Sequence, residues 1–286
     1  RYQDDLPLSL PPQYKDIIFK LTAEPKVSVI ILTKNNFNLI KNNINSWNEC
    51  VNYENYEILI ADTGSSPDVI NKYSEILSNK IKLIQYNWYN FGKINNDMVR
   101  NHVSEDTELI LFCNDDVKLL NDVLSRCVEI YNINKENVGT IGIRLHFADA
   151  SVQHCGITIV RDITNNIHLT HIDLRKTNNY FTGINYNSLG NTGAFLLINK
   201  QVFIDIGYFN ESYIECFEDV ELNLNCLIKG KKNITVCDAV AYHYESMSRD
   251  RSNDKLENLN RDYFERLHPF YFKNKEVLNK IIRLIK

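Results

Sequence analysis

Four short apolar runs, separated by segments of helical periodicity, constrain the fold of this chain most strongly. Each run is continuous rather than alternating, which is typical of strands buried on both faces of a parallel sheet. The runs are Val27–Thr33, Glu57–Ala61, Ile81–Tyr86 and Leu109–Cys113. Between them, apolar residues recur at helical spacing, as in Val69–Leu77 and Ile94–Val103. This alternation predicts an α/β fold with right-handed βαβ units and a mainly parallel central sheet flanked by helices.

The second half of the chain has a less regular pattern. Further strands are expected at Val138–Leu145, Gly156–Val160, Ala194–Ile198 and Ile234–Val240, and helices at Lys200–Ile206 and Val220–Lys229. The segment Arg161–Leu189 is polar and rich in Asn, which predicts a long surface excursion. From Asn258 onward the pattern is helical again, with a break at Pro269.

Composition excludes several classes of protein. With 286 residues, 44% of them hydrophobic, the chain suits one large α/β domain. A net charge of −4 lacks the basic footprint of a nucleic-acid binder. No apolar run reaches the roughly 18 residues that span a bilayer, and no secretory signal pattern opens the chain. Seven cysteines without a C-x-x-C pair are typical of reduced thiols in a cytosolic protein.

Polar clusters follow three of the first four strands, at the point where each strand ends. They are Thr33-Lys34-Asn35, Asp62-Thr63-Gly64 and Asn114-Asp115-Asp116. Because ligands of open α/β sheets bind beyond the carboxyl ends of the strands, we expect these clusters to converge. Oxygen ligands of this kind suit Mg²⁺ or Mn²⁺, which usually also take oxygens from a phosphate-bearing ligand. The clusters therefore predict a divalent ion that holds a diphosphate.

Within these clusters the residues have different expected tasks. We expect Asp116 on the metal, Asn114 near a ribose or the metal, and Asp115 assisting. Asp62 can accept hydrogen bonds from a ribose hydroxyl or a base N–H. The alternative for Asp62 and for the Asn114–Asp116 cluster is a turn or a helix cap, positions that Asp and Asn favour.

Acidic residues also crowd one predicted helix start in the second half of the chain. They are Glu215, Glu218, Asp219 and Glu221. The helix dipole alone accounts for one or two of them. Next to the apolar pair Cys216-Phe217, a carboxylate could instead be a general base with a raised pKa.

Two histidine patterns and the basic tail leave alternatives open. His243 follows a predicted strand between two tyrosines, where a structural role is the usual one and a metal-ligand role is the alternative. His168 and His171 lie in the polar excursion, and no set of Cys and His completes a zinc site.

The tail Lys273–Lys286 carries five basic residues and one apolar face. It either packs on the domain as a terminal helix or contacts an anionic membrane surface.

The absence of G-x-G-x-x-G and Walker A sequences argues against a dinucleotide-binding dehydrogenase and a P-loop enzyme. The order of the motifs instead resembles the family 2 glycosyltransferases of the GT-A fold. The resemblance rests on seven segments: Val27–Asn35, Glu57–Pro67, Asn90–Asn96, Phe112–Asp116, Asn191–Ala194, Gly207–Glu211 with Glu218-Asp219, and His243.

The resemblance implies a set of site residues. It places Thr33, Asn35, Asp62, Lys93, Asn96, Asn114 and Asp115 at the nucleotide, and Thr192, Gly193 and Ala194 at the sugar and acceptor. It implies Asp116 and His243 as metal ligands, and Asp219 as the catalytic base beside Glu218. The chain departs from the family pattern at Leu32, Lys34, Asn114, Tyr208 and Asn210.

The resemblance also implies a domain plan. Residues 1–25 form an irregular arm, and 26–250 the GT-A domain. Its nucleotide half covers about 26–118 and its acceptor half about 119–250. Residues 251–286 form a helical tail packed on the domain.

The implied activity is an inverting, metal-dependent glycosyltransferase. It moves a sugar from a nucleotide-diphosphate donor to a hydroxyl of a glycan or glycolipid, with Mn²⁺ or Mg²⁺ as cofactor. The expected setting is polysaccharide biosynthesis in the cytoplasm or at the inner face of the membrane, with peripheral contact through the basic tail. The alternatives are a sugar nucleotidyltransferase and a non-catalytic glycan-binding domain on the same scaffold.

Overall fold

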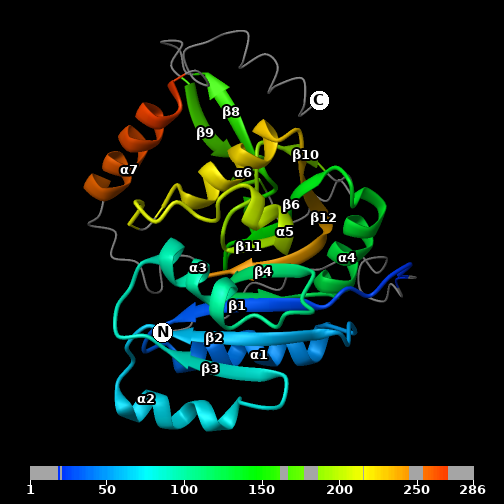
Figure 1. Ribbon diagram of the computed structural model, residues 1–286, viewed down its shortest axis with the longest axis vertical. Coiled ribbons are helices and arrows are strands. Elements are labelled where there is room, and N and C mark those ends of the chain that lie inside the picture. The colour runs from blue at the N-terminus through cyan, green and yellow to red at the C-terminus, as the bar shows by residue number, and fades with distance from the viewer. Residues whose placement is uncertain are drawn as a thin grey trace.

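A curled, mixed β-sheet runs through the middle of the molecule, with helices on both of its faces (Figure 1). The computed structural model describes residues 19, 21–161, 167–176, 186–214, 216–244 and 254–269. Within these residues ten strands form one sheet, whose main path runs β10-β12-β6-β11-β4-β1-β2-β3. Strand β5 pairs with β12, β7 pairs with β6, and β8 and β9 form a separate hairpin.

The first half of the chain forms the regular part of this sheet. Its elements are β1 (Val27–Thr33), α1 (Phe37–Cys50), β2 (Tyr56–Asp62), α2 (Pro67–Lys72), the short 3₁₀ turn η2 (Tyr73–Glu75), β3 (Ile81–Gln85), α3 (Phe91–Asn101) and β4 (Leu109–Asn114). Strands β3, β2, β1 and β4 are parallel neighbours, with β1 between β2 and β4. The predicted parallel sheet is therefore confirmed for this half.

The second half extends the sheet from β4 in mixed directions. Its elements are β5 (Val117–Leu119), α4 (Val123–Asn134), β6 (Val138–His146), β7 (Val152–His154), β8 (Ile157–Arg161), β9 (Ile167–His171), β10 (Tyr186–Ser188), β11 (Phe195–Asn199), α5 (Lys200–Asp205), α6 (Glu218–Ile228), β12 (Lys232–His243) and α7 (Asp254–Leu267). Strand β11 runs antiparallel to both β4 and β6, and it joins the two halves into one sheet.

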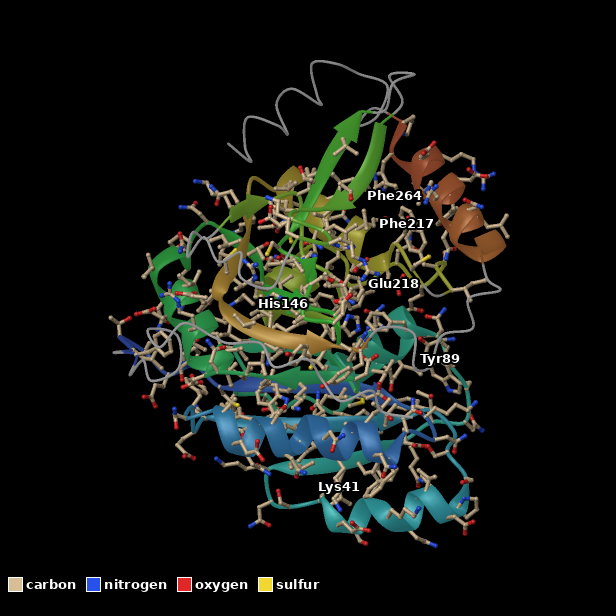
Figure 2. All side chains as sticks on the ribbon, turned by 180° about the vertical axis from the view of Figure 1, so that it is seen from behind. Lys41, Tyr89, His146, Phe217, Glu218 and Phe264 are labelled. Atoms are coloured by element: carbon tan, nitrogen blue, oxygen red, sulfur yellow. The ribbon has the colours of Figure 1, made fainter. Side chains whose placement is uncertain are left out.

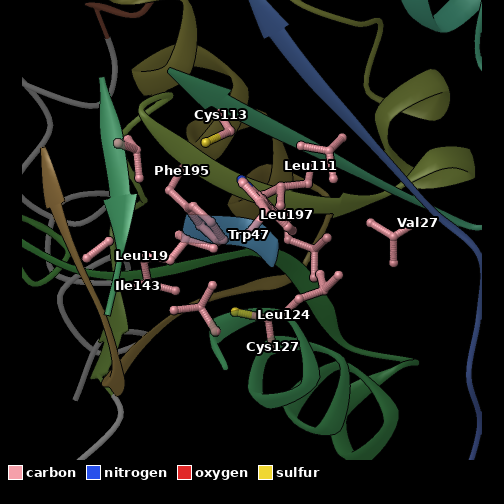
Figure 3. Close-up of a cluster of buried hydrophobic side chains, with 14 of the residues drawn as sticks. Val27, Trp47, Leu111, Cys113, Leu119, Leu124, Cys127, Ile143, Phe195 and Leu197 are labelled. Carbon is pink, nitrogen blue, oxygen red and sulfur yellow. The ribbon is translucent and has the colours of Figure 1, made fainter. Parts of the chain in front are cut away.

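The core forms because successive strand residues point to opposite faces of the sheet. On β4, Leu111 and Cys113 pack in the cluster that contains α1 and α4, whereas Ile110 and Phe112 pack in the cluster that contains α3, α5 and α6. Figure 3 shows the first cluster, with Trp47 of α1 among side chains of the sheet and of α4. This burial on both faces explains why the strands read as continuous apolar runs rather than alternating ones.

Several sequence-based boundaries were wrong where tertiary pairing decides the structure. The alternative role of the Asn114–Asp116 cluster as a helix cap is wrong, because the residues that follow it form β5, which pairs with β12. Strand β12 extends three residues beyond its predicted end, so His243 is the last residue of a strand instead of following one. The expected surface excursion contains β9 and β10, and β9 pairs with β8. Three-residue strands such as β5 and β7 carry too little pattern to be recognised locally.

Parts of the expected domain plan fall outside the described residues. These parts are most of the arm before residue 19, the segments 245–253 and 270–286, and with them the basic tail. Among the described residues, no helix is both long and apolar enough to cross a bilayer.

A buried carboxylate on β2 gives the fold a measurable dependence on pH. Burial would raise the pKa of Glu57, but hydrogen bonds from Ser104, Lys82 and Ser28 outweigh this effect and lower it to about 2. A folded-state pKa below the unfolded value stabilises the protein above about pH 4.5, and this stabilisation is lost as the pH falls towards 2.

We therefore predict that Glu57→Gln lowers the free energy of unfolding at pH 7 by about 2 kcal/mol. The stability of the variant should also fall less steeply than that of the wild type between pH 5 and pH 2. Urea titrations at several pH values measure both effects. The control is Glu54→Gln, two residues before β2. The Glu54 side chain is 83% exposed beside Lys80, so this change should have no measurable effect on the free energy of unfolding. Parallel pH curves for wild type and Glu57→Gln would contradict the assignment.

Candidate active site

The three polar strand ends meet at one edge of the sheet. Thr33 at the end of β1 is paired in register with Asp62 of β2, and Leu32 is paired with Asn114 of β4. The Thr33 hydroxyl donates to Asp115 Oδ2 at 2.7 Å, and the backbone N–H of Thr63 donates to the Thr33 carbonyl at 2.9 Å. The sheet thus brings these clusters together, as the sequence predicted.

Asp62 sits at the end of β2 with a side chain that is 1% exposed. Its Oδ1 accepts the backbone N–H groups of Gly64 and Ser65, and its Oδ2 accepts the hydroxyls of Ser65 and Tyr73. These hydrogen bonds form the turn that the sequence analysis gave as the alternative role of Asp62. Contact with a nucleotide stays a prediction for Asp62, because a ligand would have to compete with these donors.

Asn35 is linked to the same turn. It has a positive φ of 56°, which Asn tolerates better than most residues. Its backbone N–H donates to Ser65 Oγ at 2.7 Å, and its side-chain oxygen accepts the N–H of Ser66 at 2.8 Å. The loops after β1 and β2 therefore form one rigid unit at the edge of the site.

The turn after β4 is held from below by helix α1. The buried amide of Asn43 donates to the carbonyls of Asn114 and Val117, at 3.1 and 2.8 Å. Burial raises the pKa of Asp115 to about 7, and the charge of Asp116 adds to this rise, while the hydrogen bond from Thr33 opposes it. Asp115 is 7% exposed and its Oδ2 accepts the Thr33 hydroxyl, so the side chain faces the loop after β1 rather than open solvent.

Asp116 and His243 face each other across the β4 and β12 strand ends. Asp116 Oδ1 is buried, accepts no hydrogen bond and lies 3.2 Å from His243 Nε2. The other ring nitrogen, Nδ1, lies 2.7 Å from the side-chain oxygen of Gln153 on β7, and the Gln153 amide donates to the His243 carbonyl. Because a side-chain oxygen can only accept, Nδ1 carries a proton, and Nε2 is the ring atom that can offer a lone pair to a cation beside Asp116.

This arrangement fits a divalent cation. A carboxylate oxygen and an imidazole lone pair 3.2 Å apart repel each other unless a proton or a cation lies between them. The amide nitrogen of Asn114, Nδ2, also lies 3.2 Å from His243 Nε2. A rotation of the amide group would bring its oxygen to the same place. Among the described residues no group of three or more His, Cys, Asp or Glu that could hold a metal is present. Oxygens of a diphosphate would supply the remaining ligands, as Mg²⁺ sites commonly require.

Gln153 is a functional candidate that the sequence reasoning missed. Its partner His243 lies 90 residues away, and only the pairing of β7 and β12 with β6 brings them together. No local signal marks such a residue, since a hydrogen bond to a distant ring leaves no spacing in the sequence.

We predict that Gln153→Ala weakens Mn²⁺ binding about 10- to 100-fold, because residues that orient a metal-ligating His typically have effects of this size. Titration of the protein with Mn²⁺, followed by electron paramagnetic resonance of the free ion, measures the affinity directly. Gln201→Ala is the matched control, since Gln201 is exposed on α5 and contacts only surface groups. Equal affinities in the two variants would remove Gln153 from this role.

The predicted catalytic base is linked to the same cluster through the two residues just before β11, Gly193 and Ala194. Asp219, in the first turn of α6, accepts the backbone N–H of Gly193 on Oδ2 at 2.7 Å and the N–H of Val220 on Oδ1 at 2.8 Å. The next residue, Ala194, accepts the N–H of Asn114 at 3.0 Å. Asp219 is half-buried, whereas Glu218 is buried at 5% exposure. Of the two acids, Asp219 is therefore the one with access to a substrate.

A buried network of asparagines fixes this arrangement. The Asn223 amide, one turn along α6, donates to the carbonyls of both Asn191 and Asp219, at 2.8 and 2.6 Å. Its oxygen accepts the N–H of Asn191 and the hydroxyl of Thr140. Gly190 must lack a side chain, because a Cβ there would approach Asn223 to 2.4 Å. The segment with Thr192 and Gly193 is thus tied directly to the helix that carries Asp219.

Two predicted nucleotide residues lie on α3, and the structure gives them different surroundings. Lys93 is exposed, with its amino group 5.2 Å from the Trp88 ring centre. Asn96 is buried, and its amide is engaged on both sides by the segment 209–211, through Phe209 and Glu211. Its contact with a nucleotide stays a prediction that would require these hydrogen bonds to break, and its visible task is to position that segment.

One departure from the family pattern has a structural explanation. Tyr208, where the family has a second Gly, adopts a φ of 68°, a conformation that costs little only for Gly. The ring is covered by the Arg100 guanidinium at 4.4 Å and by Phe203 at 5.2 Å. Packing thus holds a conformation that the side chain disfavours.

Comparison with known proteins shows the family of this chain and supports its fold class. Residues 28–207 match the family model of glycosyl transferase family 2. The chain belongs to glycosyl transferase family 2. The matched range includes the strand-end clusters of β1, β2 and β4 but stops before Asp219 and His243. In this glycosyltransferase the roles of those two residues therefore rest on their positions in the fold.

Two relatives are similar over most of the chain. It is 27% identical over 243 residues to the uncharacterized protein y4gI of Sinorhizobium fredii, covering 81% of this chain and 26% of that protein. It is 25% identical over 250 residues to the O-antigen biosynthesis protein RfbC of Myxococcus xanthus, covering 84% of this chain and 19% of that protein. The chain thus spans about a quarter or less of the length of these relatives.

Two solved structures share the GT-A fold of this glycosyltransferase. GalNAc-T7 with UDP, GalNAc and Mn²⁺ aligns with a TM-score of 0.63 at 13% identity, over 79% of this chain and 45% of the other. The mannosyltransferase PcManGT of Pyrobaculum calidifontis, in complex with GDP-Man and Mn²⁺, aligns with a TM-score of 0.63 at 15% identity, over 97% and 74%. The predicted fold class is thereby confirmed.

Proposed function

We propose that this glycosyltransferase moves a sugar from a nucleotide-diphosphate donor to a hydroxyl of a glycan or glycolipid, with inversion at the sugar carbon. The observation that carries the proposal is the continuous series of contacts at the sheet edge. It runs from Thr33 and Asp115, through Asp116 and His243, to Asn114, Ala194 and Asp219. One rigid frame would then hold a donor diphosphate near Thr33 and Asp115 and an acceptor hydroxyl near Asp219.

In this proposal Asp219 takes the proton of the acceptor hydroxyl as its oxygen attacks the sugar carbon. The hydrogen bond from the Gly193 N–H fixes the carboxylate and leaves further lone pairs for the acceptor. Attack from the face opposite the departing diphosphate inverts the configuration at that carbon. Thr192, Gly193 and Ala194 would then line the space for the sugar and the acceptor, while Thr33, Asn35 and Asp62 border the nucleotide.

Asp116 and His243 would hold the divalent cation, with Asn114 as an additional ligand. Bound there, Mn²⁺ or Mg²⁺ supplies positive charge that stabilises the leaving diphosphate. The Mn²⁺ in the two similar solved structures, whose titles also name UDP and GDP-Man, supports this choice of cofactor and donor class.

Similarity to an O-antigen biosynthesis protein supports a role in polysaccharide assembly. A cytoplasmic location is part of the proposal, in line with a sequence whose cysteines form no C-x-x-C pair. Contact of the basic tail with a membrane surface stays a prediction, because that tail lies outside the described residues.

Thermal-shift measurements with Mn²⁺ against UDP-, GDP-, dTDP- and CMP-sugars test the donor class. A donor at a hundred times its dissociation constant should raise the melting temperature by about 5 °C or more. CMP-sugars carry one phosphate and serve as the control for diphosphate recognition. Release of a nucleoside diphosphate from the stabilising donor supports transfer, whereas formation of pyrophosphate from the matching nucleoside triphosphate and a sugar 1-phosphate would indicate a nucleotidyltransferase. Binding without any donor turnover would indicate a glycan-binding domain.

A further inference from the structure

The C-terminal helix α7 packs against the segment that leads into the catalytic helix α6. Tyr263 of α7 lies edge-on to Tyr213, with ring centres 5.2 Å apart, and Phe264 lies 5.6 Å from Phe217. The Asn260 amide donates to Cys216 Sγ at 3.4 Å. These contacts come from little more than one turn of α7 and fall on the residues just before Glu218 and Asp219.

A further contact reaches α6 itself. His268, directly after α7, lies 3.4 Å from the carboxylate of Glu221. Phe264 is 2% exposed and belongs to one apolar cluster with Tyr213 and with Leu224 of α6. Figure 2 shows Phe264 and Phe217 side by side, with Glu218 next to them on the way into the domain. Helix α7 thus touches both the approach to α6 and its first turns.

Phe217 is the residue whose conformation these contacts hold. Its φ is 77°, in the left-handed region that a bulky side chain disfavours, and it occupies the N-cap position of α6 without a side-chain capping bond. Such a conformation persists only when the surrounding structure imposes it. Here the surroundings of its ring include Phe264, so α7 supplies part of that constraint.

The conformation of Phe217 decides where Asp219 points, because Asp219 follows only two residues later. Asp219 Oδ2 meets the Gly193 N–H at 2.7 Å on the other side of the site. If Phe217 relaxed to negative φ, the first turn of α6 would begin in a different direction and this contact would be lost. A displacement of about 1 Å in a reacting group can reduce turnover about a hundredfold.

We propose that Phe264, supported by Tyr263, is a positioning residue of this enzyme: packed on Phe217, it keeps the start of α6 in the conformation that aims Asp219 at the acceptor. The inference rests on the proposed role of Asp219 as the general base. It assigns a catalytic purpose to a helix that lies outside the part of the chain matched by the family model.

The central experiment compares Phe264→Ala with Leu259→Ala in the full chain. Leu259 lies on the same helix but is 62% exposed, so its truncation is the matched control. Hydrogen exchange followed by mass spectrometry reads the effect without any substrate. In Phe264→Ala the amides of residues 213–222 should exchange about tenfold faster, while those of β4 keep the wild-type rate. A change in both regions would indicate general destabilisation and overturn the inference, as would no change in residues 213–222.

Kinetics supply the second measurement. With Mn²⁺ and the UDP- or GDP-sugar that stabilises the wild type, nucleoside diphosphate release by Phe264→Ala should fall about 10- to 100-fold in kcat. The KM for the donor should stay unchanged, because the nucleotide contacts lie on the other half of the site. Phe264→Leu, which keeps an apolar side chain there, should recover most of the activity. Equal kcat values for Phe264→Ala and Leu259→Ala would contradict the proposal.

A double-mutant cycle with Phe217→Gly tests the mechanism and covers the case in which Phe264→Ala does not fold. Glycine adopts positive φ without help from packing. Phe217→Gly should therefore keep most of the activity, and adding Tyr263→Ala to it should cost less activity than Tyr263→Ala costs in the wild-type background. Fully additive effects would overturn the proposal.

The Asp219→Asn variant separates failure of this inference from failure of the proposed function. If Asp219→Asn retains turnover, Asp219 is not the base, and the positioning role falls with it. If Asp219→Asn is inactive while Phe264→Ala behaves like Leu259→Ala, only the positioning role is wrong.

Discussion

Asp219→Asn is expected to reduce sugar transfer by about a thousandfold or more while leaving nucleotide binding nearly unchanged. The amide keeps the size of the side chain and an oxygen that can accept the Gly193 N–H, but it cannot take a proton from the acceptor. Because Asp219 lies beyond the strand ends that border the nucleotide, the donor site should remain intact. Steady-state kinetics with the identified donor, together with calorimetric binding of the nucleoside diphosphate and Mn²⁺, measures both effects.

The matched control for this variant is Asp205→Asn, which makes the same chemical change on the exposed surface of α5. It should retain wild-type turnover. If Asp219→Asn kept a large share of wild-type activity, another group would have to accept the proton. Glu218 would then be the next residue to replace, although its carboxylate is buried.

Asp116→Ala should abolish the metal-dependent part of nucleotide binding, with a loss of about a hundredfold or more. The variant removes the carboxylate that faces the His243 lone pair, and His243 alone is a poor site for Mn²⁺ or Mg²⁺. Calorimetric titration of the nucleoside diphosphate with and without Mn²⁺ gives the coupling directly. Binding that is equal with and without Mn²⁺ in both proteins would count against the metal site.

The same variant has a second expected signature in the absence of metal. Asp116 Oδ1 is buried and accepts no hydrogen bond, so its charge costs free energy in the metal-free protein. The melting temperature of metal-free Asp116→Ala should therefore equal or exceed that of the wild type. Asp62→Ala is the contrasting variant, since its carboxylate accepts four hydrogen bonds and its loss should destabilise the fold. A large drop in the stability of metal-free Asp116→Ala would show that Asp116 is mainly structural.

The strands and the polar residues at their ends could be predicted because both are local in sequence. Strand β1 has the bounds that its apolar run indicates, β3 and β4 differ by one residue at one end, and β2 is one residue longer at each end. The convergence of Thr33, Asp62 and Asn114 then follows from parallel pairing, which places strand ends of the same polarity at one edge.

The remaining parts of the site depend on contacts that leave no local pattern. Gln153 reaches His243 over 90 residues, and Asn223 joins Asn191 over 32 residues. Asn96 shows a related case: its nucleotide contact stays a prediction from a motif, and the motif gave no sign that packing engages its amide with the Phe209 backbone. A polar side chain in a sequence gives no sign of which partner will satisfy it once it is buried.

The sequence by itself determined the α/β architecture, the edge of the sheet at which the polar strand ends gather and the acidic residues available there, because periodicity and strand ends are properties of short segments. Only the tertiary structure decided which of these residues act together. The pairing of Asp116 with His243, the link from Asp219 to Gly193 and the packing of Phe264 on Phe217 each join distant segments. Such contacts form only when the whole sheet and its helices are in place, since no short segment contains both partners.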